Sequence, residues 1–392
     1  MTEDHGGRPS REDRLDRHRL QLFDFLLGVL FGIVGPMAYL APLGLAILLP
    51  LIAGALLLDA RRRRGAGGIA EPLRRAPFLW ALGLLALVSA FWALVPGAAA
   101  VEAIRLLAET FIGLTLLGMT GRLSEDARRR VAIALAVGFG AAALLMIADA
   151  ALGGPLFVRI HQRPLTADTI ANSYSRGAIL HALILPPLLI ALLRWRYRVG
   201  AALSLAVAAA AVYSLHSASA KLALPCGLAA RQPSALHRLY IWQFVDRHIM
   251  ERPLLGWGMD AARTLAGPGD IVTLYRCATA DHPRQAIGMG GLLPLHPHNA
   301  ILQIWLEFGA LGALAAAAAL RAMALPLFAK GGERAGAAAA AGTLAAAFLS
   351  AGISFGIWQP WWIASLFLCA MAARLAGAGE RLTKKPSIIW QS

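Results

Sequence analysis

The string HPHN at residues 296–299 contains side chains that can move a proton. An imidazole has an ordinary pKa of about 6.5, so His298 can act as a general base near neutral pH, and Asn299 could orient a hydroxyl or the imidazole. The structural alternative is that His296 and His298 only cap a helix or rest at a membrane interface. A metal site at His296 and His298 is disfavoured, because no carboxylate or cysteine is adjacent.

The elements that position this group are expected to be membrane helices. Of the 392 residues, 58% are hydrophobic, which is more than one water-soluble core can hide, because ordinary domains are nearer half apolar. The formal net charge of +15 lies in short blocks between apolar runs, with no helix-turn-helix, RRM-like or zinc-finger pattern. We therefore expect a polytopic protein that contacts membrane lipids and binds no nucleic acid.

Apolar runs long enough to cross a bilayer, roughly 20 residues each, recur along the chain. Blocks of Lys and Arg in alternate connections place both termini in the cytoplasm by the positive-inside rule. The segment 217–230 is short and contains Lys221 and Pro225, which predicts a re-entrant or partial helix. The runs predict about ten spans, near 22–37, 41–59, 77–95, 101–119, 131–152, 174–193, 199–216, 300–328, 335–356 and 360–377.

The predicted fold class is all-α, a polytopic transmembrane helix bundle with one large periplasmic loop. Chemistry on the outer face would involve this loop. The predicted parts are a cytoplasmic tail (1–21), an N-terminal membrane helix bundle (22–230), the periplasmic loop (231–297), C-terminal membrane helices (298–378) and a second cytoplasmic tail (379–392).

Charged residues also occur inside the predicted spans. Glu102, Arg105 and Glu109 are spaced so that they share one helix face. We expect an internally neutralised structural group rather than a functional one, although intramembrane charges often mark function. Glu307 lies in the helix after His298 and either lines the same cavity or has a packing or hydrogen-bonding role.

Two motifs resemble those of the O-antigen ligase and polymerase superfamily. His298 and Asn299 are followed after nine residues by Gly309 and after two more by Gly312, which resembles the family signature. Upstream, RLYIWQFVDRHIMERPLLGWGMDAAR at 238–263 is similar to the family's basic, Trp-containing helix with its P-L-L-G-x-G turn. The resemblance covers about 233–312 of the chain.

The resemblance implies metal-independent glycosyl transfer on the periplasmic face of the bacterial inner membrane. The donor would be an undecaprenyl-pyrophosphate-linked glycan, and a sugar hydroxyl of a lipid A-core or glycan acceptor would attack its anomeric carbon. The diphosphate would leave, and His298 would be the general base. The three cysteines form no C-x-x-C pair, and no cofactor is expected.

A diphosphate needs cations, and arginine forks match phosphate oxygens. Arg238 matches the family's loop arginine, and Lys221 stands where many family members have a basic residue. Arg176, at the predicted outer end of the sixth span, could be another phosphate clamp. Each has a structural alternative, such as an exposed loop arginine at Arg238 or a snorkelling lysine at Lys221.

The chain departs from the family in length. Family members usually have about twelve helices that cross the bilayer. Compared with them, this chain lacks about one helix hairpin between Pro225 and Gln232. The leading interpretation is a ligase that transfers to the lipid A-core; a polymerase using the same donor, or a relative that glycosylates proteins, shares the signature. A transporter or a non-catalytic scaffold is the alternative from another class, although no inverted repeat supports transport.

Overall fold

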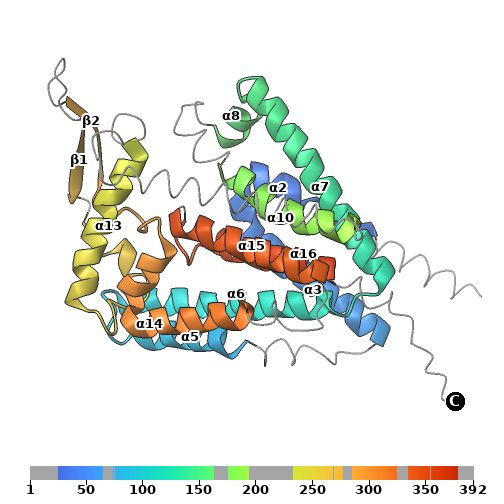
Figure 1. Ribbon diagram of the computed structural model, residues 1–392, viewed down its shortest axis with the longest axis horizontal. Helices are drawn as coiled ribbons and strands as arrows, with labels where there is room; N and C mark the ends of the chain where they lie inside the picture. The colour runs from blue at the N-terminus through green and yellow to red at the C-terminus, as the bar shows by residue number, and fades with distance from the viewer. Residues whose placement is uncertain are drawn as a thin grey trace, which may run out of the picture.

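The computed structural model describes residues 25–64, 74, 76–162, 175–193, 233–267, 269–276, 285–324, 334–353 and 355–377. Within these residues the protein is mostly helical (Figure 1). The helices are α2 (Val34–Leu40), α3 (Leu45–Arg64), α5 (Pro77–Ser89), α6 (Pro96–Thr120), α7 (Glu125–Ala151), α8 (Pro155–His161), α10 (Ser175–Leu193), α13 (Pro233–Glu251), α14 (Ala300–Ala324), α15 (Arg334–Ile353) and α16 (Pro360–Gly377), with short 3₁₀ turns η1 (Pro42–Gly44) and η4 (Ala261–Arg263) and strands β1 (Ile271–Arg276) and β2 (Gln285–Gly291).

Three of the described helices are long and apolar enough to cross a membrane, at Pro42–Arg61, Glu125–Ala151 and Ala300–Arg321. Shorter apolar helices occupy Phe25–Leu40, Pro77–Ser89, Ala340–Ile353 and Pro360–Leu375. These helices fit a polytopic membrane protein. The count of about ten spans stays a prediction, because the run at 199–216, the partial helix at 217–230 and both tails lie outside the described residues.

Helix α16 is the centre of the bundle and packs against α3, α6, α10 and α15. Its first turn buries two indoles, Trp361 and Trp362, at 2% and 0% exposure. The ring of Phe355 lies 4.7 Å from Trp361 and 5.2 Å from Trp362. Aromatic side chains bury large areas and prefer such tilted contacts, so this cluster fixes the segment that leads into α16.

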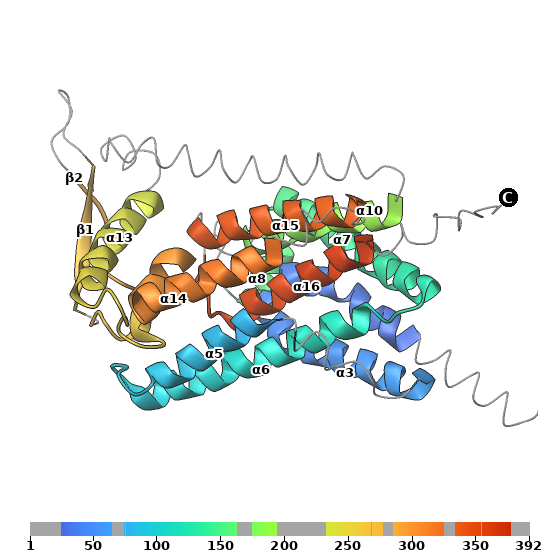
Figure 2. The same ribbon diagram turned by 60° about the horizontal axis from the view of Figure 1, so that its bottom comes forward.

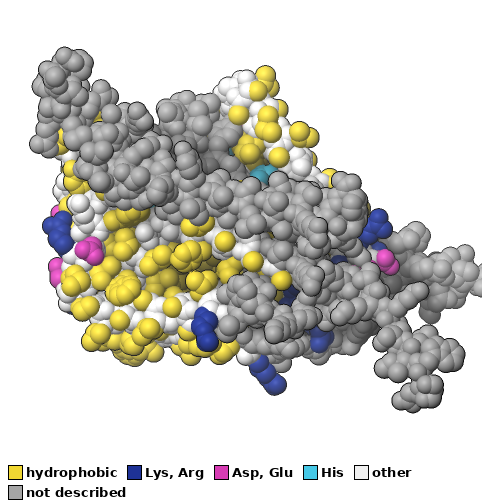
Figure 3. All heavy atoms as spheres, in the orientation of Figure 1, with side chains coloured by type: hydrophobic (Ala, Val, Ile, Leu, Met, Phe, Trp, Pro, Cys, Tyr) yellow, Lys and Arg dark blue, Asp and Glu magenta, His cyan; other side chains and the backbone are white. Residues whose placement is uncertain are grey.

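Large hydrophobic side chains also lie on the outside of the bundle. Figure 3 shows them over much of the face formed by α5 and α14. Leu84 is 54% exposed, Ile104 58% and Leu314 68%. Apolar patches of this kind are costly in water, but they need no protein partner where the surrounding solvent is lipid.

Helix α13 and the strands β1 and β2 form a separate layer at one end of the bundle. Figures 1 and 2 both place α13 and the β1–β2 hairpin there, with α13 running across the ends of the other helices. Leu236 of α13 packs with Leu274 of β1 in a small core. The ring Nε2 of His237 lies 2.8 Å from the carbonyl oxygen of Gly291, which attaches β2 to the helix.

The hairpin corrects the expectation of an all-α fold. The two strands pair antiparallel, from Ile271 opposite Gly291 to Arg276 opposite Gln285, with an irregularity between Leu274 and Tyr275. Short apolar runs do not distinguish a strand from a helix by periodicity alone. The glycines of β2 further weaken the strand pattern in the sequence.

Candidate active site

Helix α14 is broken at Gly309, where the backbone has φ 58° and ψ −153°. The P-L-L-G-x-G turn docks at this break through backbone hydrogen bonds. They run from the N–H of Trp257 to Leu306 (2.9 Å), from Gly258 to Glu307 (2.8 Å) and from Ala310 to Pro253 (2.8 Å). The two motifs recognised in the sequence are therefore in direct contact with each other.

Both sides of this contact require glycine. Gly309 and Gly256 have positive φ angles of 58° and 67°, a region that side chains disfavour. A Cβ on Gly309 would lie 2.6 Å from the nitrogen of Leu255, and one on Gly256 would lie 2.6 Å from the oxygen of Glu307. A side chain at either position would separate the turn from the helix.

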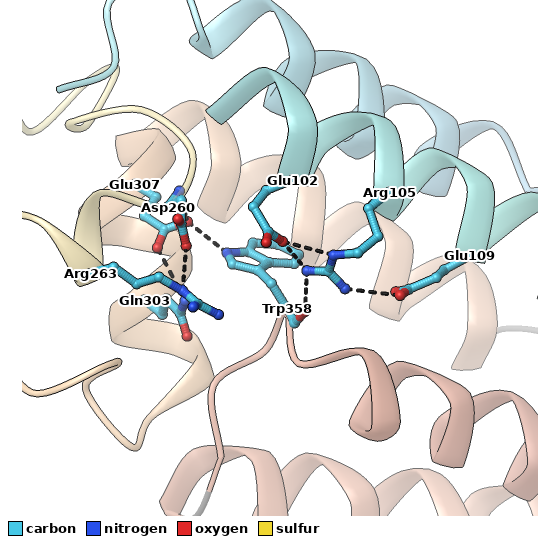
Figure 4. Close-up of polar contacts among 8 residues, drawn as sticks. All are labelled: Glu102, Arg105, Glu109, Asp260, Arg263, Gln303, Glu307 and Trp358. Atoms are coloured by element: carbon cyan, nitrogen blue, oxygen red, sulfur yellow. Dashed lines mark hydrogen bonds and ion pairs between the residues drawn. The ribbon is translucent and has the colours of Figure 1, made fainter. Parts of the chain in front are cut away.

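A buried carboxylate lies beneath the docked turn. Glu307 has no exposed surface and accepts three hydrogen bonds, from Trp358 Nε1 (2.6 Å), Gln303 Nε2 (3.1 Å) and the backbone N–H of Asp260 (3.2 Å) (Figure 4). Gln303 in turn accepts a bond from the N–H of Ile357 (3.0 Å). Buried polar groups are normally satisfied in this way, so Glu307 has the hydrogen-bonding role considered for it.

The charged residues of α6 pair with one another, as the sequence predicts. Arg105 donates from Nε to Glu102 (2.8 Å) and from Nη1 to Glu109 (2.9 Å). Its Nη2 also donates to the backbone carbonyl of Trp358 (2.8 Å). Figure 4 shows this group beside the Glu307 network, and Trp358 belongs to both.

The two histidines lie together just before α14. His298 has a left-handed backbone, with φ 54°, and its N–H donates to Nδ1 of His296 (3.2 Å). The two rings are 4.3 Å apart at 66°. The segment is tied to α13, because Trp242 Nε1 donates to the carbonyl oxygen of Pro297 (2.9 Å).

Positive charges from three elements surround His296. Burial, and to a smaller extent the positive charges of His298, Arg263, Arg176 and Arg238, lower the pKa of its imidazole to about 3. Arg176 begins α10, Arg238 lies in α13 and Arg263 ends η4. The fold therefore brings together arginines that are far apart in the sequence, around one histidine pair.

Two of these guanidinium groups have no acidic partner among the described residues. Arg176 is half-buried, its Nε has no hydrogen-bond partner, and its guanidinium carbon is 5.5 Å from the centre of the Trp361 ring. Arg238 is also half-buried, and burial lowers the pKa of its guanidinium. A buried cation without a counter-ion is costly, so both side chains favour an anionic ligand.

Arg263 is a neighbour of the site that the sequence analysis did not single out. Its Nε forms an ion pair with Asp260 at 2.8 Å. Burial raises the pKa of the Asp260 carboxyl to about 6, and the nearby charge of Arg263 opposes this rise. The signal for Arg263 was its place at the end of the resembling motif, but nothing in that spacing indicated that its charge would act on His296.

Two further residues, Asn299 and Lys221, were predicted to bind substrate. Asn299 uses its side-chain oxygen to accept from the N–H groups of Ile301 (3.0 Å) and Leu302 (3.1 Å), so it caps α14. Lys221 lies outside the described residues. Within the part of the chain that the structure describes, no cluster of three or more His, Cys, Asp or Glu could hold a metal ion.

Residues 165–317 match a family described as O-antigen ligase, which confirms the resemblance predicted from the two motifs. A relative in Rickettsia conorii is 37% identical over 136 residues, which are 35% of this chain and 30% of the relative. A relative in Rickettsia prowazekii is 39% identical over 136 residues, which are 35% of this chain and 31% of the relative. Both are named "Putative polysaccharide ligase". The matched region spans about three tenths of the length of these relatives, and no solved structure matches.

Proposed function

Starting from the O-antigen ligase match of residues 165–317, we propose that this protein is a glycosyltransferase of the bacterial inner membrane. It moves a polysaccharide from undecaprenyl pyrophosphate to a sugar hydroxyl of the lipid A-core. In this proposal the 231–297 segment lies in the periplasm between the membrane helices 22–230 and 298–378. The active site is then on the periplasmic face.

One observation carries the proposal. Two half-buried guanidinium groups, Arg176 and Arg238, have no acidic partner among the described residues and lie close enough to His296 to act on its pKa. A diphosphate offers the charge and the oxygen atoms that two arginine forks bind best. The arginines would take the place of a metal ion in holding this group.

The chemistry follows from this placement. The acceptor hydroxyl attacks the anomeric carbon of the donor while His298 takes the hydroxyl proton. The bond between the anomeric carbon and the diphosphate oxygen breaks, and the electron pair leaves with the diphosphate. Arg176 and Arg238 stabilise the negative charge that develops on this leaving group. Lys221 would add a further cation at the same ligand.

The acceptor separates this proposal from its nearest alternatives. A polymerase would use the same donor and the same base, and would place a second lipid-linked glycan where the lipid A-core binds. A protein-glycosylating enzyme would place a protein hydroxyl there. Arg176 and Arg238 would contact the donor, and His298 the reacting hydroxyl, in all three cases, so the experiment has to vary the acceptor.

The test is transfer by the purified protein in nanodiscs. Wild type and His298→Ala are given an undecaprenyl-pyrophosphate glycan and a panel of acceptors, with EDTA present, and products are analysed by gel and mass spectrometry. We expect wild type to transfer and His298→Ala to be slower by about 100-fold or more, the usual size of a general-base contribution. His161→Ala is the matched histidine control, since its ring stacks on Phe157 in its own helix α8.

The outcomes lead to different conclusions. The acceptor that becomes glycosylated distinguishes a ligase from a polymerase. Equal transfer by wild type and His298→Ala would remove His298 from the mechanism. Failure of the wild type with every donor and acceptor would favour the transporter or scaffold interpretation instead.

A further inference from the structure

His296 lies beside the proposed base but has a different environment. We propose that His296 is a positioning residue for the transfer reaction: its neutral ring accepts the backbone N–H of His298 and so fixes the direction in which the His298 imidazole points. This inference rests on the proposed function, because it assigns the geometry of the base to a residue that does not contact substrate. The backbone of His298, the packing of the His296 ring and the charges around it each support this role.

The backbone of His298 has an unusual conformation. Its φ of 54° lies in the left-handed region, where few residues other than glycine are found, although histidine is tolerated better than most. The hydrogen bond from its N–H to Nδ1 of His296 (3.2 Å) compensates for this conformation. Only a ring with a lone pair on Nδ1 can accept this bond, so the proton of neutral His296 must be on Nε2.

The ring of His296 packs closely against Gly356. His296 is only 9% exposed, and a Cβ on Gly356 would lie 2.9 Å from Cγ and 3.0 Å from Cδ2 of its ring. The ring of His298 contacts it on another side, at 4.3 Å between centres. The His296 ring is thus held between the segment leading into α16 and the proposed base, and a side chain at 356 would displace it.

The electrostatic environment of His296 explains why two histidines so close together would have separate roles. Burial, together with the charges of Arg263, Arg176 and Arg238 and of His298 when it is protonated, brings the pKa of His296 down to about 3. His296 therefore stays neutral at every pH at which the reaction would run, and its Nδ1 remains an acceptor. Different environments that separate the ionisation of neighbouring groups are a common way to divide such roles.

The experiment uses the full chain in nanodiscs and compares His296→Ala with His296→Asn. Alanine removes the acceptor, whereas the Oδ1 atom of asparagine occupies nearly the position of Nδ1 and can accept the same N–H. We expect His296→Ala to lower kcat by about 10-fold to 100-fold, the range that misplacement of a catalytic group produces. The KM for the donor should change by less than about two-fold, because Arg176 and Arg238 are untouched. His296→Asn should retain most of the wild-type kcat.

Gly356→Ala provides an independent variant if His296→Ala does not fold. It keeps both histidines and displaces the ring of His296, so kcat should again fall with little change in donor KM. Gly140→Ala is its matched control, since a Cβ there meets no atom within 4 Å.

The outcomes for the two proposals are distinct. If the wild type is inactive, or His298→Ala is as active as wild type, the proposed function fails and this inference fails with it. If His298→Ala is inactive but His296→Ala keeps the wild-type kcat, the proposed function stands and the inference is wrong. The inference is also wrong if His296→Asn folds but is as slow as His296→Ala, because the acceptor atom would then not be what matters.

Discussion

Glu307 and Trp358 are joined by a 2.6 Å hydrogen bond from the indole Nε1 to the carboxylate, and this bond connects α14 with the segment that leads into α16. The same carboxylate accepts the N–H of Asp260 in the docked turn. Three segments that meet only in the folded protein therefore depend on one side chain.

Glu307→Ala should destabilise the protein more than any single loss of surface charge. It leaves the buried donors of Trp358, Gln303 and Asp260 without an acceptor, at roughly 1–3 kcal/mol for each unsatisfied group. The melting temperature in detergent should fall by several degrees, as expected for a loss of a few kcal/mol. Glu251→Ala, at the exposed end of α13, is the control. Equal melting temperatures for the two variants would contradict this role of Glu307.

Arg238→Ala should weaken donor binding rather than the chemical step alone. A charge-assisted hydrogen bond is worth about 1.5–3 kcal/mol, which corresponds to an increase in donor KM of about 10-fold to 100-fold. Arg247→Ala on the same helix is the matched control, because Arg247 is exposed. An unchanged KM in Arg238→Ala, measured from transfer rates at several donor concentrations, would mean that Arg238 holds no phosphate.

The stability of the protein should depend on His296 as pH falls. The folded-state pKa of about 3 lies below the ordinary value of 6.5, so below pH 6.5 the unfolded chain takes up a proton that the folded protein does not. The stability contributed by neutral His296 is full above that pH and is lost progressively as pH falls towards 3, by up to a few kcal/mol.

His296→Asn removes this titration. Melting temperatures measured in detergent between about pH 7 and pH 4 should therefore fall less steeply for the variant than for wild type. The comparison is between the two slopes, since asparagine also changes stability at neutral pH. Parallel slopes would show that His296 is not held neutral by the fold.

Gly309→Ala should weaken the contact between α14 and the P-L-L-G-x-G turn. With φ 58° and ψ −153°, Gly309 lies in a region almost exclusive to glycine, so alanine costs about 1–3 kcal/mol in backbone conformation. Its Cβ would also lie 2.6 Å from the nitrogen of Leu255. Thermal unfolding should show a lower melting temperature. Gly140→Ala should act in the opposite direction, because alanine is favoured over glycine within a helix such as α7. A stabilising effect of Gly309→Ala would contradict the docking of the turn onto α14.

The long apolar helices were easier to predict from the sequence than the β1–β2 hairpin. Apolar runs identified α3, α7 and α14, because lipid imposes a length and composition on each span that a short segment cannot imitate. The hairpin β1–β2 was missed because its runs are short and one strand contains several glycines. The number of spans and the part boundaries remain predictions.

The candidate site was predicted only as separate residues. The charges of α6 were correctly expected to pair, because i, i+3 and i, i+4 contacts within one helix can be read from spacing. The convergence of Arg176, Arg238 and Arg263 on His296 depends on tertiary packing, and spacing along the chain contains no such information. The capping role of Asn299 had the usual signal, an asparagine just before an apolar run, but its place beside His298 favoured a chemical interpretation.

The hydrogen bond from Trp242 to Pro297 (2.9 Å) joins helix α13 to the segment that contains the two histidines. Arg238 lies four residues before Trp242 in this helix, and Pro297 directly precedes His298. One helix and one hydrogen bond therefore connect the backbone of Arg238 with the backbone of the histidine pair. The same short helix thus sets the spacing between the half-buried arginine and the two imidazoles, whatever occupies the space between them.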